Sequence, residues 1–72
     1  MTKTEKESIE AMTRVLAGEF VRCRNYARTL TDKQAAAGFA GEACGVKRAL
    51  EWLEDHFGQN WRSCYGVEEA LA

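Results

Sequence analysis

The chain has 72 residues, a formal net charge of −1 and no proline. A domain this short buries little apolar surface, and small domains usually compensate with disulfides, a metal or oligomerisation. The near-neutral charge argues against a generic nucleic-acid binder, and no apolar run approaches the roughly 20 residues of a membrane span. We therefore expect one soluble, cytoplasmic domain.

The three cysteines do not indicate disulfides or a metal centre. Cys23, Cys44 and Cys64 are an odd number, and the polar first eight residues do not resemble a signal peptide. His56 is the only other soft ligand, and no Cys-x-x-Cys pair is present. We expect no metal and no cofactor, which leaves oligomerisation as the means of completing the core.

The first predicted element is an amphipathic helix over residues 5–29. Thr4-x-x-Glu7 is a capping-box pattern, which places the start of this helix near residue 5. From there apolar residues recur in steps of three and four, which is the period of a helix and not of a strand. The stripe consists of Ile9, Met12, Leu16, Phe20, Cys23, Ala27 and Leu30.

A second helix is predicted over residues 33–57, after a turn over residues 30–32. Thr31-x-x-Gln34 is a second capping box, and Gly58 suits the left-handed conformation that ends many helices. The apolar residues keep a 3-4 spacing, the pattern of a coiled-coil-like seam. They are Ala36, Phe39, Ala43, Val46, Leu50, Leu53 and Phe57. Because two helices of similar length joined by a tight turn must lie antiparallel, we predict an all-α hairpin.

A second face of this helix is lined mainly with small residues. They lie about 100° around the helix from the apolar seam, and they are Gly38, Gly41, Gly45, Ala49 and Trp52. Each internal glycine costs ~1 kcal/mol relative to alanine, so we interpret this face as a second packing seam; fraying of the glycine-rich stretch is the alternative. The occupant would be the C-terminal tail, residues 58–72, through Trp61 and Tyr65, or another subunit. Two seams predict a four-helix-bundle dimer or a larger oligomer.

The tail itself is predicted to be a loop that ends in a short helical turn over residues 67–71. No catalytic motif occurs in the tail or elsewhere. There is no glycine-rich phosphate loop and no nucleophile beside a base, and the helix dipole explains His56 near the end of the second helix. Lys47 is expected to pair with Glu51 or Glu54 on the surface. The sequence therefore predicts a protein that is not an enzyme and has no catalytic residues.

The segment of residues 22–28 is the part of the chain most suggestive of binding. The candidate contact residues on the outer side and flank of the first helix are Arg14, Arg22, Arg24, Tyr26 and Arg28. Guanidinium groups suit phosphates or acidic protein surfaces, and a tyrosine can stack on a base. The alternative is a solvated face with local pairs such as Glu10 with Arg14. Val21 in the middle of this face favours contact.

Three short strings resemble the plasmid copy-control family Rop: Met1-Thr-Lys-x-Glu-Lys6, Asp32-x-Gln34-Ala35 and Phe57-Gly58. The resemblance implies a helical hairpin that dimerises as a four-helix bundle and binds paired RNA loops through its first helix. At the corresponding positions this chain has Lys3, Glu10, Arg14, Gly18 and Asn25, and the family's central aromatic residue is missing.

A second resemblance is to phage-encoded helical sponges that sequester cyclic nucleotide signals. These proteins are also short hairpins with a tryptophan late in the second helix, to which Ala49-Leu-Glu-Trp52 is similar.

From these observations we expect a non-enzymatic binding protein of phage or plasmid type that inhibits or regulates a host component. One alternative is a sponge for an anionic nucleotide held between subunits. The other is a Rop-like RNA-binding regulator that uses Lys3, Arg14, Arg24 and Arg28. We thus expect the chain to bind further copies of itself and, in addition, a host protein, an anionic nucleotide or RNA. We expect no membrane association.

Overall fold

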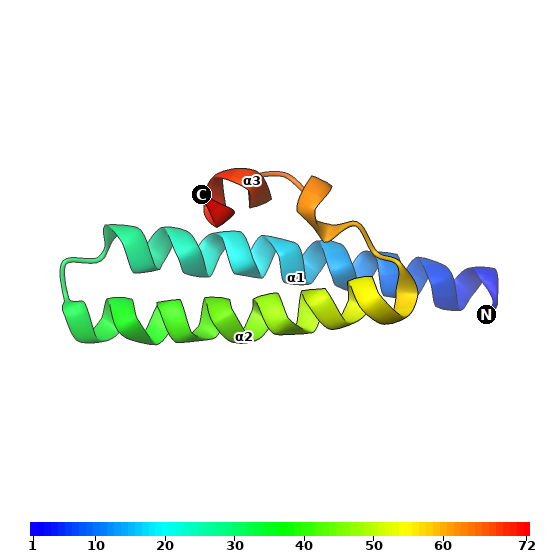
Figure 1. Cartoon of the computed structure of the whole chain (residues 1–72), viewed down its shortest axis with the longest axis horizontal. Helices are drawn as coiled ribbons and strands as arrows, with labels where there is room; N and C mark the ends of the chain where they lie inside the picture. Colours follow the sequence, from blue (N-terminus) through cyan, green and yellow to red (C-terminus); the bar gives the residue numbers. More distant parts are fainter.

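The chain forms two long antiparallel helices with a short helical tail, in a computed structural model that describes all 72 residues. Helix α1 spans Lys3–Thr29 and α2 spans Lys33–Phe57; the tail holds the 3-10 helix η1, Trp61–Ser63, and α3, Val67–Leu71 (Figure 1). Helices make up 83% of the chain and strands are absent, so the all-α hairpin is confirmed. No helix is both long and apolar enough to cross a membrane.

The helix starts are set by side chains other than the predicted ones. Thr2 caps α1: its Oγ1 accepts a hydrogen bond from the Glu5 backbone N–H at 3.1 Å and donates to the Glu5 carboxylate at 3.0 Å. The predicted start at Thr4 is therefore wrong by one half-turn. At α2, Asp32 Oδ1 accepts from two backbone N–H groups, at 2.9 and 3.1 Å. Asp32 replaces Thr31 as the cap because a carboxylate at a helix N-terminus also favours the helix dipole.

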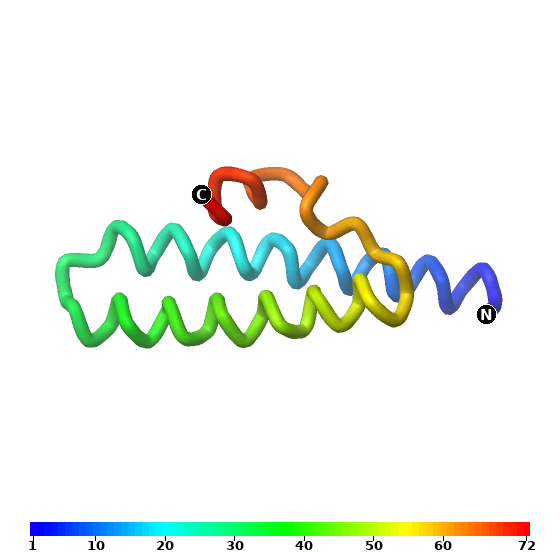
Figure 2. Tube along the Cα trace, viewed as in Figure 1, coloured from blue at the N-terminus to red at the C-terminus, as the bar shows by residue number.

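The end of α2 turns the chain back toward α1. Gly58 adopts the left-handed conformation, with φ of +66°, and its N–H donates to the Glu54 carbonyl at 2.9 Å. This is the helix stop expected of glycine at that position. Beyond it the tail runs in the same direction as α1 and lies beside it, and the C-terminus reaches the last third of that helix, where Arg28 binds the Ala72 carbonyl (Figure 2).

The core lies along α1, between α2 and the tail. Its fully buried members are Ala17, Phe20, Cys23, Ala43, Leu50, Trp61, Val67 and Ala70. The rings of Phe20 and Trp61 meet edge to face with centroids 5.9 Å apart. Thr13 and Ala17 are buried although they lie off the predicted stripe, whereas Met12 on that stripe is 55% exposed. The tail thus completes the core by covering a side of α1 that the stripe does not include.

The molecule is elongated and exposes much of its surface. Its principal extents are 46 × 18 × 17 Å and its radius of gyration is 13.2 Å, where a compact chain of this length has ~11 Å. The accessible surface is 5065 Å², against ~4,500 Å² for a typical folded monomer of this mass. The excess reflects the exposed flanks of the two long helices.

Candidate interaction surfaces

Two of the predicted contact residues hold the tail of the same chain. Arg24 Nε donates to the Ala70 carbonyl at 3.0 Å. Arg28 donates from Nη1 to the Glu69 carbonyl and from Nη2 to the Ala70 carbonyl, both at 2.9 Å, and also to the Ala72 carbonyl. The last carbonyls of a helix lack N–H donors within it and carry partial negative charge, so guanidinium groups suit them. This pair of arginines is therefore engaged within the molecule.

The tail also explains why the apolar Val21 lies among the arginines on the outer face of α1. Val21 is half-buried and packs against the core. A Cβ at Gly66 would lie 3.2 Å from Val21 Cγ1, and Gly66 has φ of +81°. A larger residue at Gly66 would meet both steric crowding and backbone strain. The contact expected for this face exists, and the chain itself supplies the partner.

The other candidate residues of α1 remain on the surface. Arg22 pairs with Glu19, which lowers the pKa of that carboxyl, and the Arg22 guanidinium carbon lies 5.7 Å from the Tyr26 ring centroid. Tyr26 in turn lies 5.0 Å from the Phe39 ring. Arg14 is exposed and forms no ion pair. These three side chains leave an exposed edge of mixed cationic and aromatic character.

The predicted local ion pairs do not form. Glu10 does not pair with Arg14, and Lys47 pairs with neither Glu51 nor Glu54. Glu54 instead binds Arg62 of the tail at 2.6 Å. Helical spacing predicts Lys47 as the partner of Glu54, but Arg62 takes that place because η1 brings it beside the end of α2.

The second seam predicted on α2 is open. We call it the seam face, and it consists of Gly38, Gly41, Gly45, Ala49 and Trp52, all exposed. A Cβ placed on any of its three glycines would meet nothing within 4 Å. The option that the tail occupies this face is wrong, since Trp61 is buried in the core and Tyr65 is 99% exposed. The alternative of fraying is wrong as well, because this stretch is helical throughout.

An apolar hollow of about 280 Å³ adjoins one end of the seam face. Its lining is entirely apolar: Met12, Leu16, Ala49, Trp52 and Leu53. Met12 is 55% exposed and Trp52 is 52% exposed, and the indole of Trp52 stacks on His56 at 4.2 Å. Exposed apolar side chains are thus concentrated at this end of the seam face.

One cluster of metal-ligating groups exists, and it differs from the cysteine–histidine set weighed from the sequence. Cys23 Sγ lies 3.7 Å from a Glu19 oxygen and 3.5 Å from a Glu42 oxygen. Burial, together with the hydrogen bond to Glu42, raises the pKa of the Cys23 thiol. The thiol thus lies within hydrogen-bond reach of two carboxylates and can donate its one proton to either. Cys44 and Cys64 take no part in it.

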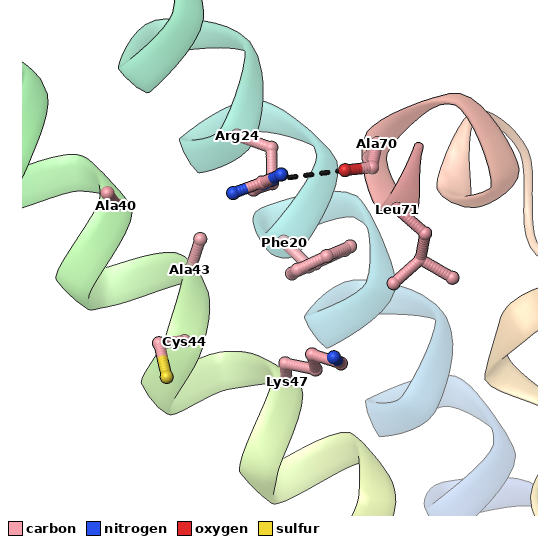
Figure 3. A pocket seen from close by; sticks show the side chains of 8 residues that line it. All are labelled: Phe20, Arg24, Ala40, Ala43, Cys44, Lys47, Ala70 and Leu71. Atoms are coloured by element: carbon pink, nitrogen blue, oxygen red, sulfur yellow. Dashed lines mark hydrogen bonds between the residues drawn. The ribbon is translucent and has the colours of Figure 1, made fainter.

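A second hollow, which no sequence pattern predicts, lies between the tail and α2 (Figure 3). Its two cationic lining residues are Arg24 and Lys47. The sequence placed Lys47 in a surface ion pair, and nothing in its spacing indicates that Leu71 of the tail would lie beside it.

Comparison of the chain with protein-family models, with curated proteins and with solved structures gives no match. The open features are the seam face, the edge formed by Arg14, Arg22 and Tyr26, and the cationic hollow under the tail.

Proposed function

We propose that this chain is a non-enzymatic binding protein of phage or plasmid type, which assembles with further copies of itself and inhibits or regulates a host component by occupying it. The observation that carries this proposal is the seam face. A row of exposed small residues ends at a half-exposed tryptophan, beside an apolar hollow. Small residues let another helix approach closely, and the hollow offers apolar area to bury.

The spacing of the seam face suits a second copy in the opposite direction. Trp52 lies seven residues after Gly45, and Gly38 lies seven residues before it. In an antiparallel pair of α2 helices centred on Gly45, the Trp52 indole of each copy would therefore lie at the height of Gly38 in the other. Ala49 would lie at the height of Gly41. Bulky and small groups alternate across such a contact, which is the arrangement that packs without voids.

The exposed area is also of the size that assembly requires. The surface of 5065 Å² exceeds that of a typical folded monomer by ~550 Å². Each partner contributes ~600 Å² to the smallest stable protein interfaces. An assembly that buries the seam face and the hollow of Met12 and Trp52 would give the molecule the surface of an ordinary folded protein.

The target surface in this proposal is the edge of α1 that the tail leaves free. Arg22 and Tyr26 stand together there, and Arg14 is unpaired. Arginine and tyrosine are enriched among residues that dominate protein contacts. RNA binding through Arg24 and Arg28 ranks lower, because both side chains already hold the tail carbonyls and would have to release them.

The assembly is tested by size exclusion with light scattering at micromolar concentration. We expect the native chain to be a dimer or a larger oligomer. Gly45→Leu should be a helical monomer, because a Cβ at this position meets nothing within 4 Å in its own chain, whereas the leucine would obstruct a second helix packed against the seam face. Gly18→Leu is the matched control, since Gly18 on α1 is equally uncrowded and lies outside the seam face. A native chain that is a stable, fully helical monomer would contradict the proposal.

The target is tested by affinity capture from host lysate, followed by mass spectrometry of both proteins and small molecules. The native chain should retain one dominant host protein, and a double variant Arg22→Ala, Tyr26→Ala should lose it. Retention of RNA or of a nucleotide in its place would support the corresponding alternative. Capture of none of these would count against a binding function.

A further inference from the structure

The hollow under the tail has a distinctive combination of shape and charge. It measures about 200 Å³ and is lined by eight residues, six of them apolar: Phe20, Arg24, Ala40, Ala43, Cys44, Lys47, Ala70 and Leu71. It shares no lining residue with the seam face or with the hollow of Met12 and Trp52. Figure 3 shows Arg24 and Lys47 on either side of the Phe20 ring.

The two cations of this hollow have no counter-charge. Neither Arg24 nor Lys47 takes part in an ion pair, and no carboxylate lines the hollow. Both side chains are half-buried, so part of their hydration is lost. The bond from Arg24 Nε to the Ala70 carbonyl, at 3.0 Å, fixes the guanidinium in place and leaves its Nη1 and Nη2 groups without a protein acceptor. An anion bound in the hollow would supply the counter-charge that both cations lack.

We propose that this hollow binds a small organic anion with one carboxylate or phosphate group and a short apolar body. The anionic group would accept hydrogen bonds from the free guanidinium edge of Arg24 and from the Lys47 ammonium. The apolar body would lie against Phe20 and Leu71. A cavity of roughly 150 Å³ holds benzene, so a single ring with one anionic substituent matches the 200 Å³ present.

The probes for this site are phenyl phosphate and benzoate, followed by amide chemical shifts in NMR titrations. At least one of them should shift the amides of Ala40, Ala43 and Leu71 in a saturable manner, and the stronger of the two identifies the preferred anion. Inorganic phosphate has no apolar body, and benzyl alcohol has no charge. Each should bind at least about tenfold more weakly than the stronger probe. Equal binding of benzyl alcohol, or no saturable shift with either probe, would overturn the proposal.

A matched pair of variants tests the role of the cations. Lys47→Gln should weaken binding of the stronger probe about tenfold, since it removes one of two charge-assisted contacts. Arg48→Gln removes the neighbouring exposed cation and should leave the affinity unchanged. An unchanged affinity in Lys47→Gln, with its helicity intact, would refute the assignment. Light scattering on the same variants keeps this test separate from that of self-assembly, which neither substitution should alter.

Discussion

Trp61 illustrates how a single tail residue organises the core. It is fully buried, its ring meets Phe20 edge to face, and the Arg62 guanidinium carbon lies 4.3 Å from its ring centroid. Its indole Nε1 has no hydrogen-bond partner, although it is buried. Leaving such a donor unsatisfied costs ~1–3 kcal/mol, so the burial and ring contacts of this side chain must outweigh that cost for it to stay buried. The position is held by packing and not by a polar contact.

Cys23 gives the fold a pH dependence on the alkaline side. Because burial raises the pKa of its thiol, the folded chain keeps this proton at pH values where the unfolded chain has lost it. That stabilisation is complete below the unfolded thiol pKa and is lost as the pH rises through the folded pKa. We expect the free energy of unfolding, from urea titrations between about pH 8 and pH 10.5, to fall more steeply for the native chain than for Cys23→Ala.

The control for this prediction is Cys44→Ala. Cys44 is exposed and lies outside the carboxylate cluster. Its removal should leave the pH slope as it is in the native chain. Equal slopes for the native chain and Cys23→Ala would show that the buried thiol does not contribute.

At the scale of the element, the caps and the periodic pattern explain both long helices. The 3-4 spacing of apolar residues places Leu50 and Leu53 in the core, and Gly58 ends α2 where the sequence predicts. The capping-box patterns place the two starts less accurately, because more than one side chain near each start can accept a backbone hydrogen bond. The caps are Thr2, two residues before the predicted Thr4, and Asp32, one residue after the predicted Thr31.

Asp32 provides a test of this selection. Asp32→Ala removes the acceptor of two backbone hydrogen bonds at the start of α2. The expected loss is ~1 kcal/mol, which corresponds to a fall in melting temperature of ~4–8 °C for a domain of this size. Thr31→Ala, at the position that the capping-box pattern favours, should change the melting temperature little. A larger loss for Thr31→Ala would reverse the assignment of the cap.

At the scale of the whole molecule, the tail decides which surfaces are free. It covers Val21 and engages Arg24 and Arg28, which would otherwise form a continuous cationic face on α1. It leaves the seam face of α2 uncovered, and it creates the hollow at Lys47. A short segment thus divides the surface into a part used for folding and a part open for contact.

Arg28→Ala tests the hold of the arginines on the tail. The variant loses hydrogen bonds to the carbonyls of Glu69, Ala70 and Ala72. Because these bonds are charge-assisted but partly exposed, we expect a loss of ~1–2 kcal/mol. Hydrogen exchange should accelerate at the amides of α3, while those in the middle of α2 stay protected.

Arg14→Ala is the matched control for this prediction, since Arg14 is exposed on the same helix and makes no ion pair. It should leave the exchange of α3 unchanged. Unaltered protection of α3 in Arg28→Ala would mean that Val67 and Trp61 hold the tail without help from the arginines.

The sequence by itself determined the two antiparallel helices, the turn between them and the short helix over Val67–Leu71. These features depend on caps, glycine conformation and apolar period, which act between residues close in the chain. Only the tertiary structure decided where the tail docks. Arg24 and Ala70 are 46 residues apart, and no periodic pattern relates positions so distant. That docking determines the roles of Arg24 and Arg28, the burial of Trp61 and the presence of the cationic hollow. None of these features could be predicted from the sequence.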